Sequence, residues 1–179
     1  MKRISLAALI ASCALLTTVS LHAQAPPPPA PELQKLAFMA GHWTASGTYT
    51  AGPPGSPSTP WTQTTDADWM DGKYFLVEHD DMDLGAMGKV KEMAVMGYDA
   101  DKKVYTYTAF SSMGEAENST GTVDGDTWTW FSDEHMGGQT MKGRFTMKVL
   151  SPTSYTMKFE LSPDGTTWMT AMEGKATKQ

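Results

Sequence analysis

Three histidines downstream of residue 23 are the side chains best able to move protons in this sequence: His42, His79 and His135. An imidazole changes its charge near neutral pH and can act as a general acid or base. His79 follows Phe75 and Val77 at two-residue spacing, so a strand here would place all three side chains on one face. We therefore expect His79 to face the interior of the fold. An isolated histidine that only forms structural hydrogen bonds remains the alternative.

Methionine is the unusual residue of the composition, with 14 copies of which all but Met1 lie beyond residue 38. Flexible thioethers suit a cavity that accepts more than one apolar shape, or they simply fill a core. Thioethers also bind Cu(I), so the pairs Met93-x-x-Met96 and Met169-x-x-Met172 are candidate copper ligands. Residues three apart on a strand point to opposite faces, so neither pair should chelate one ion. We expect no metal site and no resident cofactor.

No motif of a known catalytic machinery is present. The sequence lacks Gly-x-Ser-x-Gly, His-Glu-x-x-His and a phosphate-binding loop, so it indicates no reaction class and no catalytic residue. The acidic segment 78–83 lacks the Asp-x-Asp-x-Asp-Gly spacing of a calcium loop, and we expect it to form a solvated turn. An enzyme that acts on a small apolar substrate, with His79 as acid or base, remains an alternative.

The N-terminal 23 residues have the pattern of a secretory signal peptide. Lys2 and Arg3 precede an apolar run that extends to Leu21, and small residues follow. We expect cleavage after Ala23, because cleavage after Ala25 would require a scissile bond to proline. Cys13 is the only cysteine and lies inside this signal, so the exported chain would contain no disulfide.

Two further segments follow the signal. Residues 24–31 form a proline-rich spacer, and residues 32–179 have the length of one domain. The whole chain has a net charge of −6, and without Lys2 and Arg3 it has 12 basic and 20 acidic residues. This balance argues against nucleic acid and anionic membranes as partners. We expect no membrane insertion once the signal is removed, and the oligomeric state stays open.

The elements that must position these side chains are predicted to be strands. A short helix is expected over Glu32 to Ala40, where apolar residues recur at helical spacing. Strand-like segments separated by Asp-Gly, Gly-Gly and Pro-containing turns then follow, near 43–50, 60–70, 73–81, 90–99, 103–112, 116–124, 126–132, 138–150, 153–162 and 167–176. The predicted fold class is all-β. We expect an antiparallel up-and-down barrel of about ten strands, because closure removes exposed sheet edges.

The alternation of apolar and charged residues is cleanest in the eighth and ninth of these segments. Apolar side chains there occupy every second position, and charged ones such as Lys142, Arg144 and Lys158 lie between them. We therefore predict a lumen that binds a small hydrophobic molecule, with Trp43 at the closed end. The candidate lumen residues are Trp43, His79, Met141, Phe145, Met147, Tyr155, Met157 and Phe159. A fully packed interior, as in a structural or stress protein, is the alternative.

Three segments carry a resemblance to known proteins. Gly41-His42-Trp43 after a short helix resembles the Gly-x-Trp signature of the calycin superfamily, which includes the lipocalins. Together with residues 69–78 and 96–103, residues 36–47 resemble the domain-of-unknown-function family 1579 (DUF1579), whose members are lipocalin-like. The resemblance extends over nearly all of residues 32–178. It implies a calycin-like barrel but no reaction.

The same resemblance frames two expectations about particular residues. True lipocalins place an arginine near the end of the last strand, against the tryptophan, whereas here the final segment offers Lys175 and Lys178. Nitrobindin, a calycin relative, binds haem through a histidine inside a ten-stranded barrel. A haem-binding barrel is therefore a further alternative, and His42, His79 and His135 are its only candidate axial ligands.

Overall fold

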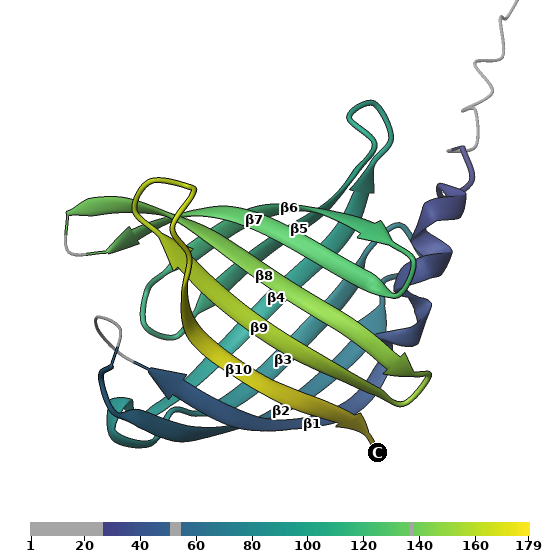
Figure 1. Ribbon diagram of the computed structural model, residues 1–179. Coiled ribbons are helices and arrows are strands. Elements are labelled where there is room, and N and C mark those ends of the chain that lie inside the picture. Colours follow the sequence, from purple (N-terminus) through teal and green to yellow (C-terminus); the bar gives the residue numbers. More distant parts are fainter. Residues whose placement is uncertain (1–26, 51–54, 137) are drawn as a thin grey trace, which may run out of the picture.

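The computed structural model describes residues 27–50, 55–136 and 138–179 and shows a closed barrel of ten antiparallel strands (Figure 1). Each strand pairs with its neighbours in sequence, and β1 also pairs with β10, so the predicted fold class and strand number are confirmed. Residues 1–23, which we expect to be a signal peptide, lie outside the described residues. The strands are β1 (Gly41–Thr50), β2 (Ser58–Trp69), β3 (Leu76–Asp83), β4 (Lys89–Asp99), β5 (Val104–Ser111), β6 (Ala116–Asp124), β7 (Thr127–Met136), β8 (Gln139–Ser151), β9 (Ser154–Ser162) and β10 (Met169–Lys178).

The expected helix before β1 is a 3₁₀ helix, η1 (Pro31–Phe38), rather than an α-helix reaching residue 40. Leu33 and Leu36 are buried against the interior, and the Tyr105 hydroxyl donates a hydrogen bond to the Glu32 carbonyl at 2.9 Å. The helix therefore closes one end of the barrel (Figure 1). A second short 3₁₀ helix, η2 (Gly85–Met87), lies between β3 and β4. Among the described residues, no helix has both the length and the apolar character needed to span a bilayer.

Aromatic rings fill the end of the barrel beneath η1. Trp128 and Trp130 are stacked with ring centroids 6.2 Å apart, and Tyr105 meets Trp128 edge to face at 4.7 Å. Trp43 is 2% exposed, and its Nε1–H donates to the Met39 carbonyl at 2.7 Å. This end is therefore packed like a protein core, with Trp43 at the closed end as predicted.

The lysine nearest the C-terminus occupies the position where lipocalins place arginine. The Lys178 Nζ lies 5.4 Å from the centre of the Trp43 ring and donates to the Phe38 carbonyl at 3.1 Å. Lys175, by contrast, is exposed. Lys178 thus links β10 to both Trp43 and η1 through one charged group.

The seam between the first and last strands contains two facing glycines. Gly47 and Gly174 are register partners, and a Cβ on Gly47 would lie 1.9 Å from the Glu173 carbonyl oxygen. A Cβ on Gly174 would lie 2.6 Å from the Ser46 carbonyl oxygen. The two backbones therefore approach too closely for any side chain at either position.

The outer face of β8 and β9 carries the expected charges. Glu160 accepts contacts at 2.8 Å from both Arg144 and Lys158 and is buried beneath them. On the inner face, Phe145 pairs with Phe159 and Met147 with Met157. The alternating positions predicted from the sequence are thus the positions that face the inside and the outside of the barrel in the structure.

Candidate functional site

Seven of the eight predicted lumen residues lie on the inner face. Trp43, Met147 and Met157 are buried. Met141, Phe145, Tyr155 and Phe159 are half-buried in the same strand phase. The structure thus brings this set together inside the barrel, and their role in binding stays a prediction.

His79 is the exception, because it is exposed on the outer face of β3. The inner face of β3 is formed by Leu76, Glu78 and Asp80, the opposite phase from the one we expected. Phe75 precedes the strand and is 45% exposed outside it, so it does not mark the interior. His79 is therefore not positioned to act as an acid or base in the lumen.

The other two histidines also lie outside the barrel. His42 Nδ1 is 2.7 Å from Asp66 Oδ1, and His135 Nδ1 is 3.0 Å from the Thr140 hydroxyl; both imidazoles are exposed. Within the described part of the chain, no imidazole points into the lumen. The haem hypothesis therefore lacks an internal axial histidine among these residues.

The methionine pairs behave differently from one another. Met93 is 41% exposed and Met96 is 3% exposed, as expected for opposite faces. Met169 and Met172 instead face Leu161 and Phe159, which share one face of β9, because a register shift lies between residues 170 and 172. The expectation of opposite faces was wrong for this second pair, since the β-bulge changes the phase.

The feature that the sequence did not indicate is a set of acidic side chains inside the barrel. The segment expected as a solvated turn is strand β3, and it directs Glu78 and Asp80 inward. Asp80 pairs directly with Glu92 of β4. Further round the wall, Glu117 of β6 and Glu134 of β7 are half-buried in the inward phase. We call Glu78, Asp80, Glu92, Glu117 and Glu134 the acidic belt.

Small residues separate the members of the acidic belt. Glu78 pairs with Ala67 on one side and with Ala94 on the other, and Ala94 pairs with Ala109. Ala109 in turn pairs with Glu117. All three alanines are fully buried, so other inner-face side chains cover them.

Hydrogen bonds satisfy two of these carboxylates. Asp80 accepts hydrogen bonds from the Thr65 hydroxyl and from the Gln63 amide, the latter at 2.7 Å. Glu92 accepts one from the Tyr107 hydroxyl at 2.8 Å. In the described residues, no side chain donates a hydrogen bond to Glu78.

Burial raises the pKa values of four carboxyl groups in the belt, those of Glu78, Asp80, Glu92 and Glu117. It raises the pKa of Glu78 well above its usual range, and the charges of Asp80 and Glu92 raise it further. Burial also raises the pKa values of Asp80 and Glu92, although their hydrogen bonds oppose the shift. For Glu117, burial and then the charges of Glu134 and Glu92 raise the pKa to about 7. Several perturbed carboxylates on one interior wall are typical of a functional site.

The interior beside the acidic belt is not completely filled. Glu78 and Tyr107 lie in the inward phase of β3 and β5, and both side chains keep solvent-accessible surface. Phe145 and Phe159, across the barrel on β8 and β9, are also only half-buried. Inward side chains with accessible surface require space between them. The barrel is therefore packed beneath η1 and partly open beyond it.

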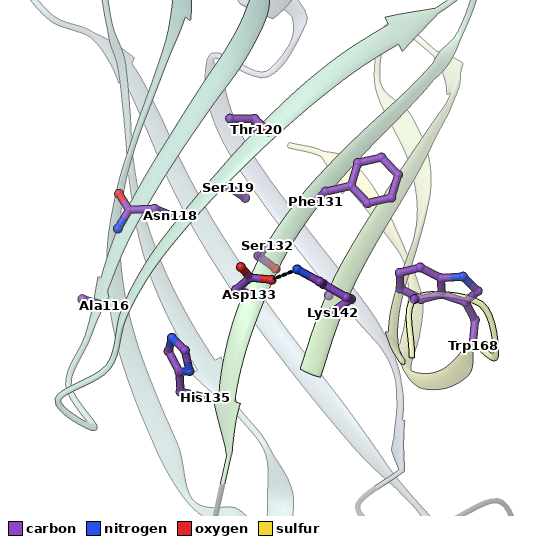
Figure 2. A pocket seen from close by; sticks show the side chains of 12 residues that line it. Ala116, Asn118, Ser119, Thr120, Phe131, Ser132, Asp133, His135, Lys142 and Trp168 are labelled. Atoms are coloured by element: carbon purple, nitrogen blue, oxygen red, sulfur yellow. Dashed lines mark hydrogen bonds and ion pairs between the residues drawn. The ribbon is translucent and has the colours of Figure 1, made fainter. Parts of the chain in front are cut away.

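A second location, on the outside of the wall, is hollow but less suited to binding. A depression of about 640 Å³ lies over β6, β7 and β8 and extends to the β9–β10 loop (Figure 2). Its Asp133 and Lys142 already form an ion pair at 2.6 Å, and Trp168 is covered by the Arg144 guanidinium 4.1 Å above its ring. The charged side chains of this depression are thus already paired, and the depression is open to solvent. The interior is thus the stronger candidate.

A closed ten-stranded antiparallel barrel, plugged by a helix and a tryptophan at one end and partly open inside, defines the lipocalin-like class of proteins. Within that class, the chain belongs to the family of proteins of unknown function DUF1579, whose profile matches residues 28–178. The resemblance noted from residues 36–47, 69–78 and 96–103 is thereby confirmed.

Solved structures of other proteins share this barrel fold. The crystal structure of Rv2717c from M. tuberculosis superposes with a TM-score of 0.59 at 15% identity, over 84% of this chain and 99% of that one. The S-type phycobiliprotein lyase CPES from Guillardia theta gives 0.56 at 10% identity, over 82% and 91%. Identities this low show a shared fold and no more. A comparison with curated protein sequences found no significant match.

Proposed function

We propose that this protein binds a small molecule with a substantial apolar part inside its barrel. The observation that carries the proposal is the accessible surface on inward side chains, such as Phe145 and Phe159, that the wall encloses. An apolar wall with a few polar groups is the usual character of a small-molecule site. The likeness to a barrel named as a phycobiliprotein lyase is compatible with this role.

The packed end of the barrel supports the same proposal. Trp43, Trp128 and η1 form a floor that is already filled, so a ligand would enter from the opposite end and rest above these rings. A rigid floor costs little conformational entropy on binding, because its side chains are ordered before the ligand arrives. The inner tryptophans also provide an optical signal, since a ligand near them changes their fluorescence.

The test is binding of the neutral fluorophore N-phenyl-1-naphthylamine, with one variant that fills the lumen. Ala94 is fully buried and faces inward beside Glu78, so the larger ring of Ala94→Phe should push neighbouring side chains into the lumen. We expect it to weaken binding about tenfold, with an overpacking cost of about 1–3 kcal/mol in stability. Val95→Phe, one residue further and on the outer face, is the matched control and should bind as the parent does. Fluorescence titration measures both.

Two results would contradict lumenal binding. One is a fluorophore that binds the parent and Ala94→Phe equally well while circular dichroism shows that both are folded. The other is the absence of binding to the parent protein.

We further propose that the protein is exported, with residues 1–23 removed as a signal peptide. Support comes from the sequence pattern of Lys2, Arg3 and the apolar run to Leu21. Expression of the full chain in a bacterial host should give a product outside the cytoplasm whose intact mass places its N-terminus at Gln24. A full-length product that stays in the cytoplasm would contradict export.

A further inference from the structure

We propose that four methionines on the surface are sites of reversible oxidation, at which peroxides convert the thioether to a sulfoxide while the barrel stays folded. The four are Met70, Met87, Met93 and Met113, which we call the exposed methionines. They lie in turns, in η2 and on the outer wall rather than in the lumen, so this inference does not rest on lumenal binding. It gives the protein a second property, the uptake of oxidant without loss of the fold.

The exposed methionines are unusually accessible for this residue type. Their exposed fractions are 50% for Met70, 47% for Met87, 41% for Met93 and 55% for Met113. Methionine is normally among the most buried residue types. Here it provides four of the eight large apolar side chains that are exposed in the described part of the chain. A thioether in water differs from an aliphatic side chain mainly because its sulfur can be oxidised, so reactivity rather than packing distinguishes these positions.

The backbone beside two of the exposed methionines is held by hydrogen bonds that do not involve their side chains. In the turn between β2 and β3, the Met70 N–H donates to the Phe75 carbonyl at 2.9 Å. In the turn between β5 and β6, the Met113 N–H donates to the Ser111 hydroxyl at 3.2 Å. Oxidation of the sulfur would leave both hydrogen bonds in place. The turns should therefore keep their conformation when these side chains become polar.

Met93 is the exposed methionine that lies in a strand. It is on the outer face of β4, where its register partners are His79 of β3 and Phe110 of β5. Both partners are exposed, so the Met93 side chain extends over the outside of the wall. A sulfoxide at this position can be hydrated without opening the sheet.

Buried methionines in the same chain provide an internal comparison. Met39, Met96, Met147 and Met157 are between 3% and 7% exposed and belong to the two hydrophobic clusters of the interior. A sulfoxide there would place a polar group in packed apolar surroundings and destabilise the fold. Exposure thus separates methionines whose oxidation the fold tolerates from methionines whose oxidation it does not.

The reaction is the transfer of one oxygen atom. The sulfur attacks an oxygen of hydrogen peroxide, the S–O bond forms as the O–O bond breaks, and the other oxygen leaves as water. The sulfur is oxidised by two electrons and the peroxide is reduced by two. The product is a pair of sulfoxide epimers, so the reaction that consumes it must be reduction by methionine sulfoxide reductases, one for each epimer.

The experiment treats the folded protein with increasing concentrations of hydrogen peroxide and follows each methionine by peptide mass spectrometry. We expect the exposed methionines to be oxidised at least about tenfold faster than the four buried ones. Once the exposed set is oxidised, Tm should stay within about 2 °C of the parent value. Incubation with both reductases and dithiothreitol should then restore the parent mass.

A combined variant tests whether the exposed sulfurs account for the rapid reaction. Met70→Leu, Met87→Leu, Met93→Leu and Met113→Leu together should remove the rapid uptake of oxygen and keep the parent Tm, because leucine has a similar volume and no sulfur. The matched control is Met96→Leu in the core, which should keep the rapid uptake.

Three results would overturn this inference. The first is oxidation of the buried methionines as fast as that of the exposed ones in the folded protein. The second is a Tm that falls as the exposed sulfoxides form. The third is a set of sulfoxides that the two reductases leave unchanged.

Discussion

Gly47→Ala is expected to prevent the barrel from closing. The added methyl group would lie 1.9 Å from the Glu173 carbonyl oxygen and 2.6 Å from the Gly174 Cα, which are both backbone atoms that no rotamer change can move. Relief requires β1 and β10 to separate at the seam, and this loses the hydrogen bonds that complete the barrel. We expect a loss of at least about 3 kcal/mol in the free energy of unfolding, measured by urea denaturation.

Gly97→Ala is the matched control for this prediction. Gly97 also lies in a strand, and its added methyl group would meet the Phe75 ring at 2.8 Å. That ring is 45% exposed and can turn away, so the expected cost is about 1 kcal/mol or less. Equal stability of the two variants would contradict the argument that backbone contact at the seam is decisive.

The protein is expected to be more stable near pH 5 than near pH 8. A carboxyl group whose pKa is raised by folding binds its proton more tightly in the folded state, so stability falls as pH rises from the unfolded pKa to the folded one. For Glu117 this window runs from 4.5 to about 7. The loss is on the order of 3 kcal/mol for Glu117 alone, or about 5–10 °C in Tm for a domain of this size. Glu78, Asp80 and Glu92 act in the same direction.

Below about pH 4, we expect the stability of the protein to fall again as the pH decreases. The pKa of Glu160 is lowered by its contacts with Lys158 and Arg144, which outweigh its burial, and the pKa of Asp164 is lowered by backbone hydrogen bonds. Their stabilisation is present above the unfolded pKa and is lost as the pH falls through the folded one. The stability profile should therefore have its maximum near pH 5.

A single variant isolates the contribution of the belt. Glu117→Gln should raise Tm near pH 8 and flatten the slope between pH 5 and pH 8, because it removes one enclosed charge. Glu173→Gln removes a carboxylate from the outer face of β10, which is exposed, and should change neither. Thermal unfolding followed by circular dichroism measures both. A parent protein with equal Tm at the two pH values would contradict the prediction.

The architecture could be predicted from the sequence because charged and apolar residues alternate along some strands. This alternation shows which side chains face the interior and which face water. In β8, Lys142 and Lys148 can only face water, so the phase of Phe145 and Met147 follows. Turn chemistry between the strands then implied neighbour pairing, and a closed barrel satisfied every edge. The inner position of the lumen candidates on β8 and β9 could therefore be predicted.

The acidic belt could not be predicted in the same way. In β3 both phases contain acidic residues, because Glu78 and Asp80 alternate with His79 and Asp81. Polarity therefore did not distinguish the inner face from the outer one. Register decides it: Leu76 pairs with Met96, and this places Asp80 opposite Glu92. A functional site that contradicts the hydrophobic pattern is hidden from arguments based on that pattern.

The pairing of β1 with β10 has a consequence for how the protein is made. No N-terminal fragment can complete the hydrogen bonding of β1, because its partner is the last strand of the chain. Contacts that span the whole sequence are slow to form. The ring of strands can therefore be joined only after β10 has been made, so the pairing that closes the barrel comes last.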